Sequence, residues 1–219
     1  MPPLAETRAW LTAHSVDGEA AQAGIDLARA ASRIQGKTSR LVEKTRTHAS
    51  LLLNAWEKAR TTRFYACFAV PALLATEKYS ATLATRGRRF APQDLATAQA
   101  RLIDGSVTRT VVLDAGVLYT RLVAPQHMNI QLARLVELSQ CPNVSIGVIP
   151  RTSAFPPPSA DFSIVGQTVL VPLVHGPVEF TTTYEFNQHG QEFAAAEQAA
   201  SFGAEATEQI AHALAATGA

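Results

Sequence analysis

The sequence contains very little cysteine. Its 219 residues include 2 cysteines, Cys67 and Cys141, and neither stands in a CxxC pair or at a Cys/His spacing typical of a metal site. Zinc sites need such spacings, so no metal is predicted. Both cysteines lie in apolar or structured stretches, and we expect a protein of the reducing cytoplasm.

A net charge of either sign is also lacking. The chain has 19 basic and 18 acidic side chains, which gives a formal charge of +1. Such a balance creates no overall field that would attract nucleic acid or an anionic membrane. Any DNA binding would have to be local, and we expect DNA not to be a partner.

Long apolar runs are missing. No stretch of about 18 apolar residues could span a bilayer, and the start, MPPLAETRAW, lacks the basic and apolar segments of a signal peptide. No membrane partner is therefore expected. With 47% hydrophobic residues, the chain has ample material for one buried core, with or without a small appendage.

Motifs for bound cofactors are absent as well. The sequence has no Gly-x-Ser-x-Gly turn, no glycine-rich phosphate loop and no dinucleotide fingerprint. Its 6 histidines are scattered, with no pair at i and i+4 beside a carboxylate. We therefore predict a protein without cofactor or metal.

The sequence favours helices in its first part and a mixture of helices and strands after it. Residues 5–60 are rich in Ala, Leu, Arg, Glu and Gln, which predicts helices near 17–23 and 26–34 and a long helix over 39–64. Pro71 then opens a further helix, because its missing N–H costs nothing in a first turn.

The rest alternates between apolar runs and turn residues. TRTVVLD and PNVSIGVIP read as buried strands on either side of a helix at 125–140, and DLATAQARLI reads as another helix. SAFPPPSA cannot be regular, because three prolines impose polyproline geometry, so it forms a surface loop or a lid. DFSIVG, TVLVPLV and VEFTTTYEF read as three short strands.

Residues from Gln191 onward return to helix. The predicted fold class is thus α+β: a helical N-terminal region, a mixed or antiparallel sheet of about five strands packed on helices, and a closing C-terminal helix.

Several blocks resemble a known family. A Pro-Gly-Leu-Leu-Gln-Thr-x-x-Tyr phrase of that family is matched at Pro71, Leu73, Leu74, Thr76 and Tyr79. The strand, QLARL helix and PNV strand, then DFSIV and TTYEF, follow in the family's order. Residues from about 50 to 215 thus resemble the C-terminal domain of unknown function in actinomycete regulators of the WhiJ type, which usually follows an XRE-type helix-turn-helix.

The sequence departs from that family at polar positions. A family glutamate falls on Trp56, the family's Gly and Gln within the phrase are Ala72 and Ala75, and an acidic residue falls on Ala115, beside the retained Asp114. Reshaping of a cavity for an apolar guest would produce such changes, and so would drift.

The N-terminal region, taken as residues 1–46, resembles a degenerate helix-turn-helix, and residues 47–219 form the expected α+β small-molecule-binding domain. DLARAAS offers few side chains that could read bases. If the head binds DNA, Arg29, Arg33 and Lys37 are the candidates for phosphate contacts, although a solvated helix surface explains them better, because Asp26 and Glu43 nearby dilute the charge.

Titratable and aromatic residues supply the candidate site. A carboxylate or imidazole in an apolar pocket can exchange protons near neutral pH, and each of these residues is also explained as an ordinary surface or core residue. The catalytic candidates are Glu185, Asp114 and His175, with Asp161 weaker. The ligand-binding candidates are Trp56, Tyr65, Phe68, Tyr119, Phe155 and Tyr184.

Two functions fit these observations. One is a small-molecule-binding protein on a regulator-derived scaffold, recruited to natural product metabolism as a cofactor-independent cyclase or isomerase that acts on a hydrophobic intermediate. The other, implied by the resemblance, is a ligand-responsive XRE-family regulator of development or antibiotic production. The family commonly dimerises, so a homodimer is one expected state.

Overall fold

The computed structural model divides the chain into two compact units, Met1–Arg46 and Thr47–Ala219. The residues that it describes are 4–15, 17–18, 21–22, 24–26, 29, 59–85, 92–103, 107–173 and 176–217. In the first unit, helix α1 spans Leu4–Ala13. Leu11 is buried, and its side chain lies close to Gly24.

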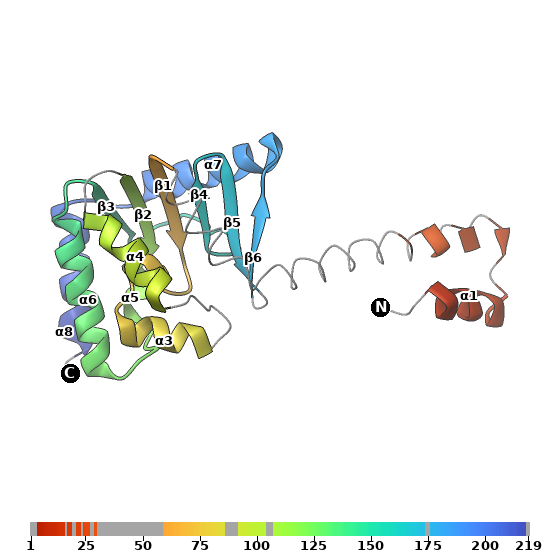
Figure 1. Cartoon of the computed structure of the whole chain (residues 1–219), viewed down its shortest axis with the longest axis horizontal. Coiled ribbons are helices and arrows are strands. Elements are labelled where there is room, and N and C mark those ends of the chain that lie inside the picture. The colour runs from red at the N-terminus through yellow and green to blue at the C-terminus, as the bar shows by residue number, and fades with distance from the viewer. Residues whose placement is uncertain are drawn as a thin grey trace. The chain divides into compact units, whose positions relative to one another are not determined.

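The second unit is built on a six-stranded sheet with the order β3-β2-β1-β4-β5-β6 (Figure 1). The strands are β1 Thr61–Ala66, β2 Thr108–Asp114, β3 Val144–Ile149, β4 Phe162–Val165, β5 Thr168–Leu173 and β6 Gly176–Phe180. Strands β1, β2 and β3 run parallel to one another. Strands β4, β5 and β6 are joined by antiparallel pairings, and β4 is antiparallel to β1. The predicted α+β fold with a mixed sheet is confirmed.

Helices make the crossovers that parallel strands require. Between β1 and β2 lie η1 Ala72–Leu74, α3 Glu77–Thr85 and α4 Pro92–Ile103. Between β2 and β3 lie α5 Ala115–Tyr119 and α6 Pro125–Ser139. The chain then closes with α7 Thr183–Ala199 and α8 Ala204–Thr217.

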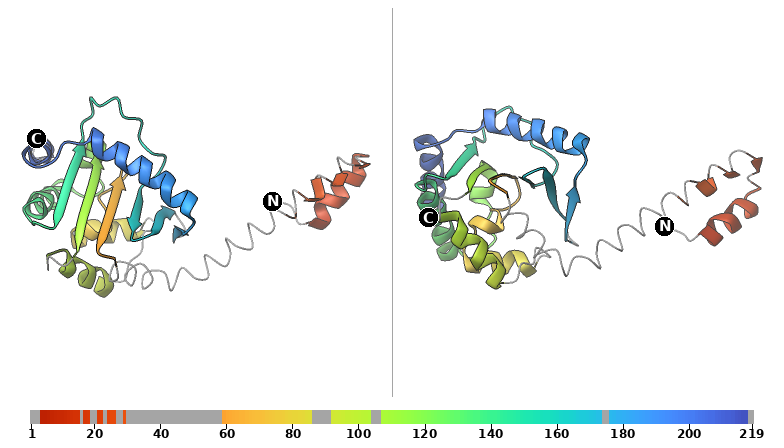
Figure 2. Two further views of the ribbon diagram at one scale, coloured as in Figure 1. Left: turned by 90° about the horizontal axis from the view of Figure 1, so that it is seen from above. Right: turned by 45° about the horizontal axis from the view of Figure 1, so that its top comes forward.

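The sheet separates two hydrophobic cores, because successive side chains of a strand point to opposite faces. Phe64 and Val111 belong to the larger core, which includes residues of η1, α3, α5, α6 and α8. Tyr65 and Val112, one residue further along each strand, belong to the smaller core beneath α7. Figure 2 shows α7 crossing one side of the sheet.

The PALLAT segment around η1 is held by two glutamines. Gln131 of α6 is fully buried; its Oε1 accepts the N–H of Thr76 (2.7 Å) and its Nε2 donates to the carbonyl of Leu74 (3.1 Å). Gln99 Nε2 donates to the carbonyls of Ala72 and Ala75, at 3.2 and 2.7 Å. Ala72 and Ala75 therefore take part in these contacts through their backbone carbonyl oxygens.

Four predicted elements differ in the structure. Residues 61–64 are strand, not the end of a long helix, because the β-branched Thr61 and Thr62 and the aromatic rings that follow favour a pleated surface; residues 39–58 of that helix lie outside the described part. Pro71 precedes a single 3₁₀ turn, and α3 begins only at Glu77. The C-terminal helix is two helices, separated at Gly203, whose φ is 61°.

The largest difference lies in VEFTTTYEF. Its strand ends at Phe180, and α7 begins at Thr183. Thr182 caps the helix. Its hydroxyl oxygen accepts a hydrogen bond from the N–H of Glu185 (3.3 Å), and its O–H donates to Glu185 Oε2 (2.8 Å). A Thr followed three residues later by Glu is a helix-start pattern that outweighs the β propensity of the three threonines.

Candidate functional site

The three parallel strands end at one edge of the sheet. The register pairs Ala66 with Leu113 and Asp114 with Ile149. The residues that follow β1, β2 and β3 therefore leave the sheet together. In open α/β sheets this carboxyl edge is where ligands bind, so its side chains form the candidate site.

Asp161 organises this edge. It is 6% exposed, and its Oδ1 accepts the backbone N–H groups of Cys67 (2.8 Å) and Phe68 (3.0 Å). The Cys67 thiol lies 3.9 Å from the carbonyl oxygen of Pro158. These contacts join the turn after β1 to the proline-rich loop that precedes β4.

Tyr65 is the most unusual residue of the edge. It is 1% exposed, and within the described residues its hydroxyl interacts with the Cys67 thiol, a weak hydrogen-bonding group, but makes no hydrogen bond of ordinary geometry. Its ring lies 6.5 Å from that of Phe155, edge to face, and 5.6 Å from that of Phe162. A buried hydroxyl left unsatisfied costs about 1–3 kcal/mol.

The local field is negative. Burial raises the pKa of Tyr65, and its interactions with Cys67, Asp114 and Asp161 raise it further. Burial also raises the pKa of the Cys67 thiol to about 12, with the charge of Asp161 as the next cause. Both groups are consequently protonated at neutral pH.

Asp114 reaches the same edge from β2. It is the last residue of the strand and caps α5, with its Oδ1 accepting the N–H of Gly116 (2.7 Å). At the other end of α5, Tyr119 is 40% exposed, and the Arg151 guanidinium lies over its ring at 5.3 Å. We call Tyr65, Cys67, Asp114, Phe155 and Asp161 the carboxyl-edge cluster.

The structure thus brings three of the predicted site residues, Tyr65, Asp114 and Phe155, together with Asp161, the weaker candidate. Phe68 adjoins them through its backbone bond to Asp161 and leaves its ring 57% exposed. Tyr119 lies one short helix away.

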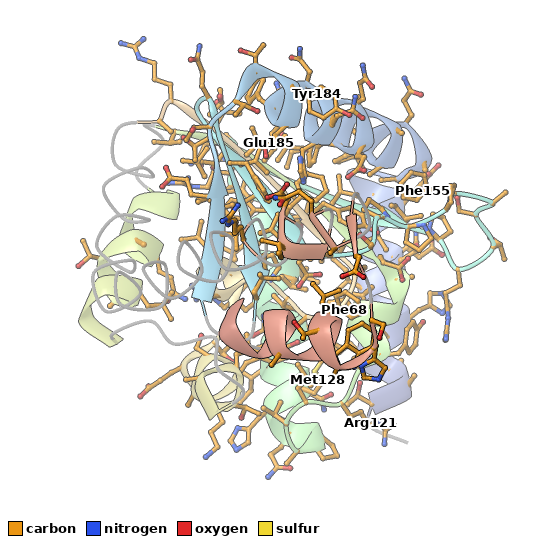
Figure 3. All side chains as sticks on the ribbon, turned by 90° about the vertical axis from the view of Figure 1, so that its right-hand side faces the viewer. Phe68, Arg121, Met128, Phe155, Tyr184 and Glu185 are labelled. Atoms are coloured by element: carbon orange, nitrogen blue, oxygen red, sulfur yellow. The ribbon has the colours of Figure 1, made fainter. Side chains whose placement is uncertain are left out.

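Tyr184 and Glu185 do not join this group. Both lie in the first turn of α7 (Figure 3). The Tyr184 side chain is 73% exposed, and the Glu185 carboxylate is bonded to Thr182. The prediction that one of them faces an apolar pocket from a strand end was wrong, because the segment is helical and places them near solvent.

The remaining predicted residues give little information. Trp56, His175, Arg33 and Lys37 lie outside the described residues. Arg29 is exposed and pairs with Asp26 at 3.1 Å, which reduces its attraction for a phosphate.

Sequence reasoning missed Cys67 as part of the site. Its position directly after a strand was the available signal, but the strand had been interpreted as helix. Asp161 was weighed as weaker because nothing in the sequence shows that its carboxylate binds two backbone N–H groups that lie more than ninety residues earlier.

The described residues contain neither a metal-binding group nor a helix that could cross a membrane. No three His, Cys, Asp or Glu side chains there are grouped so as to hold a metal ion. Among the helices in those residues, none combines the length and the apolar character that crossing a bilayer needs.

Residues 50–212 match the family described as a domain of unknown function, DUF5753. The chain belongs to this family. The carboxyl-edge cluster lies wholly within the matched residues of the DUF5753 domain.

Other comparisons add little about the DUF5753 domain. No curated protein matches the sequence. A solved structure that resembles it is that of TrmBL2, an archaeal chromatin protein whose structure shows a mode of DNA binding. The likeness covers 84% of this chain and 70% of TrmBL2 at 10% identity, with a TM-score of 0.39. A likeness this weak supports no conclusion about either fold or function.

Proposed function

We propose that this DUF5753 domain binds a small molecule at the carboxyl edge of its parallel strands, beneath the loop of residues 150–160. The observation that carries the proposal is the Tyr65 hydroxyl, which is buried and makes no hydrogen bond of ordinary geometry among the described residues. A group left in this state is stabilised when a bound molecule supplies the missing hydrogen bond.

The loop of residues 150–160 brings the Phe155 ring against Tyr65. Phe155, whose ring contacts Tyr65, is only partly buried, and its backbone N–H is bonded to Ser153 within the same loop. The segment from Pro156 to Pro158 favours extended polyproline geometry and supplies no backbone donors. A ligand that reaches the Tyr65 hydroxyl would therefore displace the Phe155 ring without breaking a strand pairing.

Sensing is the role that this geometry supports best. The resemblance to WhiJ-type regulators with an XRE-type head implies a ligand-responsive domain. A ligand that bonds to the Tyr65 hydroxyl and displaces the Phe155 ring would change the conformation of the loop, and that change could be the signal. On this proposal the ligand leaves the site unchanged.

A cofactor-independent cyclase or isomerase is the second candidate. One observation favours it: the buried Tyr65 phenol stays protonated, so it could donate a hydrogen bond to an oxygen on which negative charge develops. The predicted carboxylate Glu185 is not at this site, so Asp114 would have to carry the proton transfer. The substrate would be a hydrophobic polyene, polyketide or terpenoid intermediate of natural product metabolism.

Binding is tested by a thermal-shift screen of polyketides, terpenoids and small aromatic compounds. For a compound that raises the melting temperature of the wild type, we expect Tyr65→Phe to remove most of the increase. The matched control is Tyr184→Phe, which deletes the same hydroxyl from an exposed ring. A ligand whose effect is unchanged in Tyr65→Phe would place its site elsewhere.

The two roles are separated by the fate of the ligand. The compound found in the screen is incubated with stoichiometric protein, and the mixture is followed by mass spectrometry and NMR. A sensor returns the compound unaltered. An enzyme yields a product, and Tyr65→Phe then lowers the rate without an equal loss of binding.

A further inference from the structure

We infer that the ligand of the carboxyl-edge cluster carries a protonated amine on a flat apolar body. The inference rests on the proposed function and deepens it by naming the charge of the ligand. Three features of the cluster lead to it: carboxylates from two separate elements, a buried hydroxyl oxygen, and neighbouring aromatic faces.

The first feature is the convergence of two carboxylates on one strand end. Asp161 is fixed to the turn after β1 by the N–H groups of Cys67 and Phe68. Leu113 pairs with Ala66 in the parallel register, so Asp114 and Cys67 are the next residues on neighbouring strands. One carboxylate thus lies at the end of β2 and the other just before β4, and both are next to the end of β1.

The second feature is the Tyr65 hydroxyl. Its oxygen can accept a hydrogen bond, and an ammonium group is a donor with three N–H bonds. The pKa of Tyr65 is raised partly by the charges of Asp114 and Asp161, so the same field that opposes a phenolate favours a cation. A carboxylate or phosphate ligand would meet repulsion at this position.

The third feature is aromatic surface. The rings of Phe155 and Phe162 lie near that of Tyr65, and Phe68, whose backbone N–H is bonded to Asp161, is 57% exposed. Aromatic faces attract cations and stack on flat apolar groups. Arg151 already uses such an attraction over Tyr119, at 5.3 Å.

Two arginines of the surrounding elements make contacts elsewhere. The Arg63 guanidinium lies 5.9 Å from the centre of the Phe193 ring, and Arg121 donates to the carbonyl of Ala216 at 3.4 Å. The carboxylates of Asp114 and Asp161 raise the pKa of Tyr65 through their charges. The same two charges would attract a cationic ligand to this edge.

Three probes of one shape test this inference: 1-naphthylmethylammonium, 1-naphthylmethanol and 1-naphthoate, which are a cation, an uncharged molecule and an anion. Their dissociation constants for the full chain are measured by naphthalene fluorescence anisotropy at pH 7 and at two salt concentrations. We expect the cation to bind about tenfold more tightly than the alcohol, and the anion to bind most weakly. Added salt should reduce the preference for the cation.

Conservative variants identify the groups responsible. Asp114→Asn and Asp161→Asn remove a charge but keep an oxygen that accepts from the same backbone N–H groups. Each should weaken the cation about fivefold and leave the alcohol unchanged. Glu137→Gln, at an exposed position of α6, is the control with an equal change of charge and should have no effect.

The outcomes separate the two proposals. If Tyr65→Phe weakens all three probes but the cation has no advantage, the inference fails and the binding site stands. If no probe binds in a way that depends on Tyr65, both fail. A cation preference that disappears in Asp114→Asn and Asp161→Asn, and persists in Glu137→Gln, confirms the inference.

Discussion

Tyr65 is buried and Cys67, two residues later, is partly buried, and their polar groups are compensated to different degrees. The thiol is a weak donor that costs little to bury, and it lies near the carbonyl of Pro158. The phenol carries a strong donor and makes no hydrogen bond of ordinary geometry in the described residues. Protein interiors rarely retain such a group, so its persistence at a strand end indicates a binding site more strongly than the aromatic rings around it do.

The raised pKa of Cys67 predicts a slow reaction with alkylating agents. Because the thiolate is the reactive form and the pKa is about 12 against an ordinary 9.0, we expect the iodoacetamide rate to rise about tenfold per pH unit from pH 8 to pH 11. In urea the rate should level off near pH 9. The labelled Cys67 peptide is quantified by mass spectrometry, and a plateau near pH 9 in the folded protein would contradict the prediction.

The two backbone bonds to Asp161 predict a difference between two substitutions. Asp161→Ala leaves the N–H groups of Cys67 and Phe68 without this acceptor and should reduce the free energy of unfolding by about 2–4 kcal/mol. Asp161→Asn retains an oxygen at the same position and should cost about 1 kcal/mol or less. Urea denaturation measures both, and equal losses would show that the charge, rather than the acceptor, stabilises the turn.

At the scale of elements, the sequence predicted best where apolar runs were long. The strands of TRTVVLD and PNVSIGVIP and the helix between them were confirmed, because β-branched runs and a 3.6-residue repeat carry their own signals. The strand Thr61–Ala66 was hidden in a helix-rich stretch. Its conformation depends on pairing with β2 and β4, and that pairing is not visible locally.

The glutamine contacts of α6 predict that the PALLAT segment is sensitive to one buried amide. Gln131→Leu removes both bonds, from the N–H of Thr76 and to the carbonyl of Leu74, and should lower the free energy of unfolding by about 2–3 kcal/mol. Gln126→Leu makes the same change at an exposed position of the same helix and should be nearly neutral. Equal urea midpoints for the two variants would show that the amide does not hold the segment.

At the scale of the molecule, the site arises from the change of strand direction at β1. On one side of β1 lies the parallel strand β2, so Cys67 and Asp114 follow their strands at the same edge of the sheet. On the other side lies the antiparallel strand β4, which begins at that edge directly after Asp161. Sequence reasoning identified Asp114, Tyr65 and Phe155 from their residue types. Their meeting point could not be predicted, because it depends on which strands are parallel.

The charge of the whole chain leads to the last prediction, which concerns DNA. A formal charge of +1 provides no broad attraction, and Arg29, the candidate phosphate contact that the structure describes, is paired with Asp26. We expect the full chain to bind a random 30-base-pair duplex with a Kd weaker than about 1 μM at 0.15 M salt, and selected sequences to bind no better. Fluorescence anisotropy at several salt concentrations measures the affinity and its slope. A selected duplex bound at nanomolar Kd, with a slope that indicates six or more phosphate contacts, would establish a working DNA-binding head and favour the regulator over the enzyme.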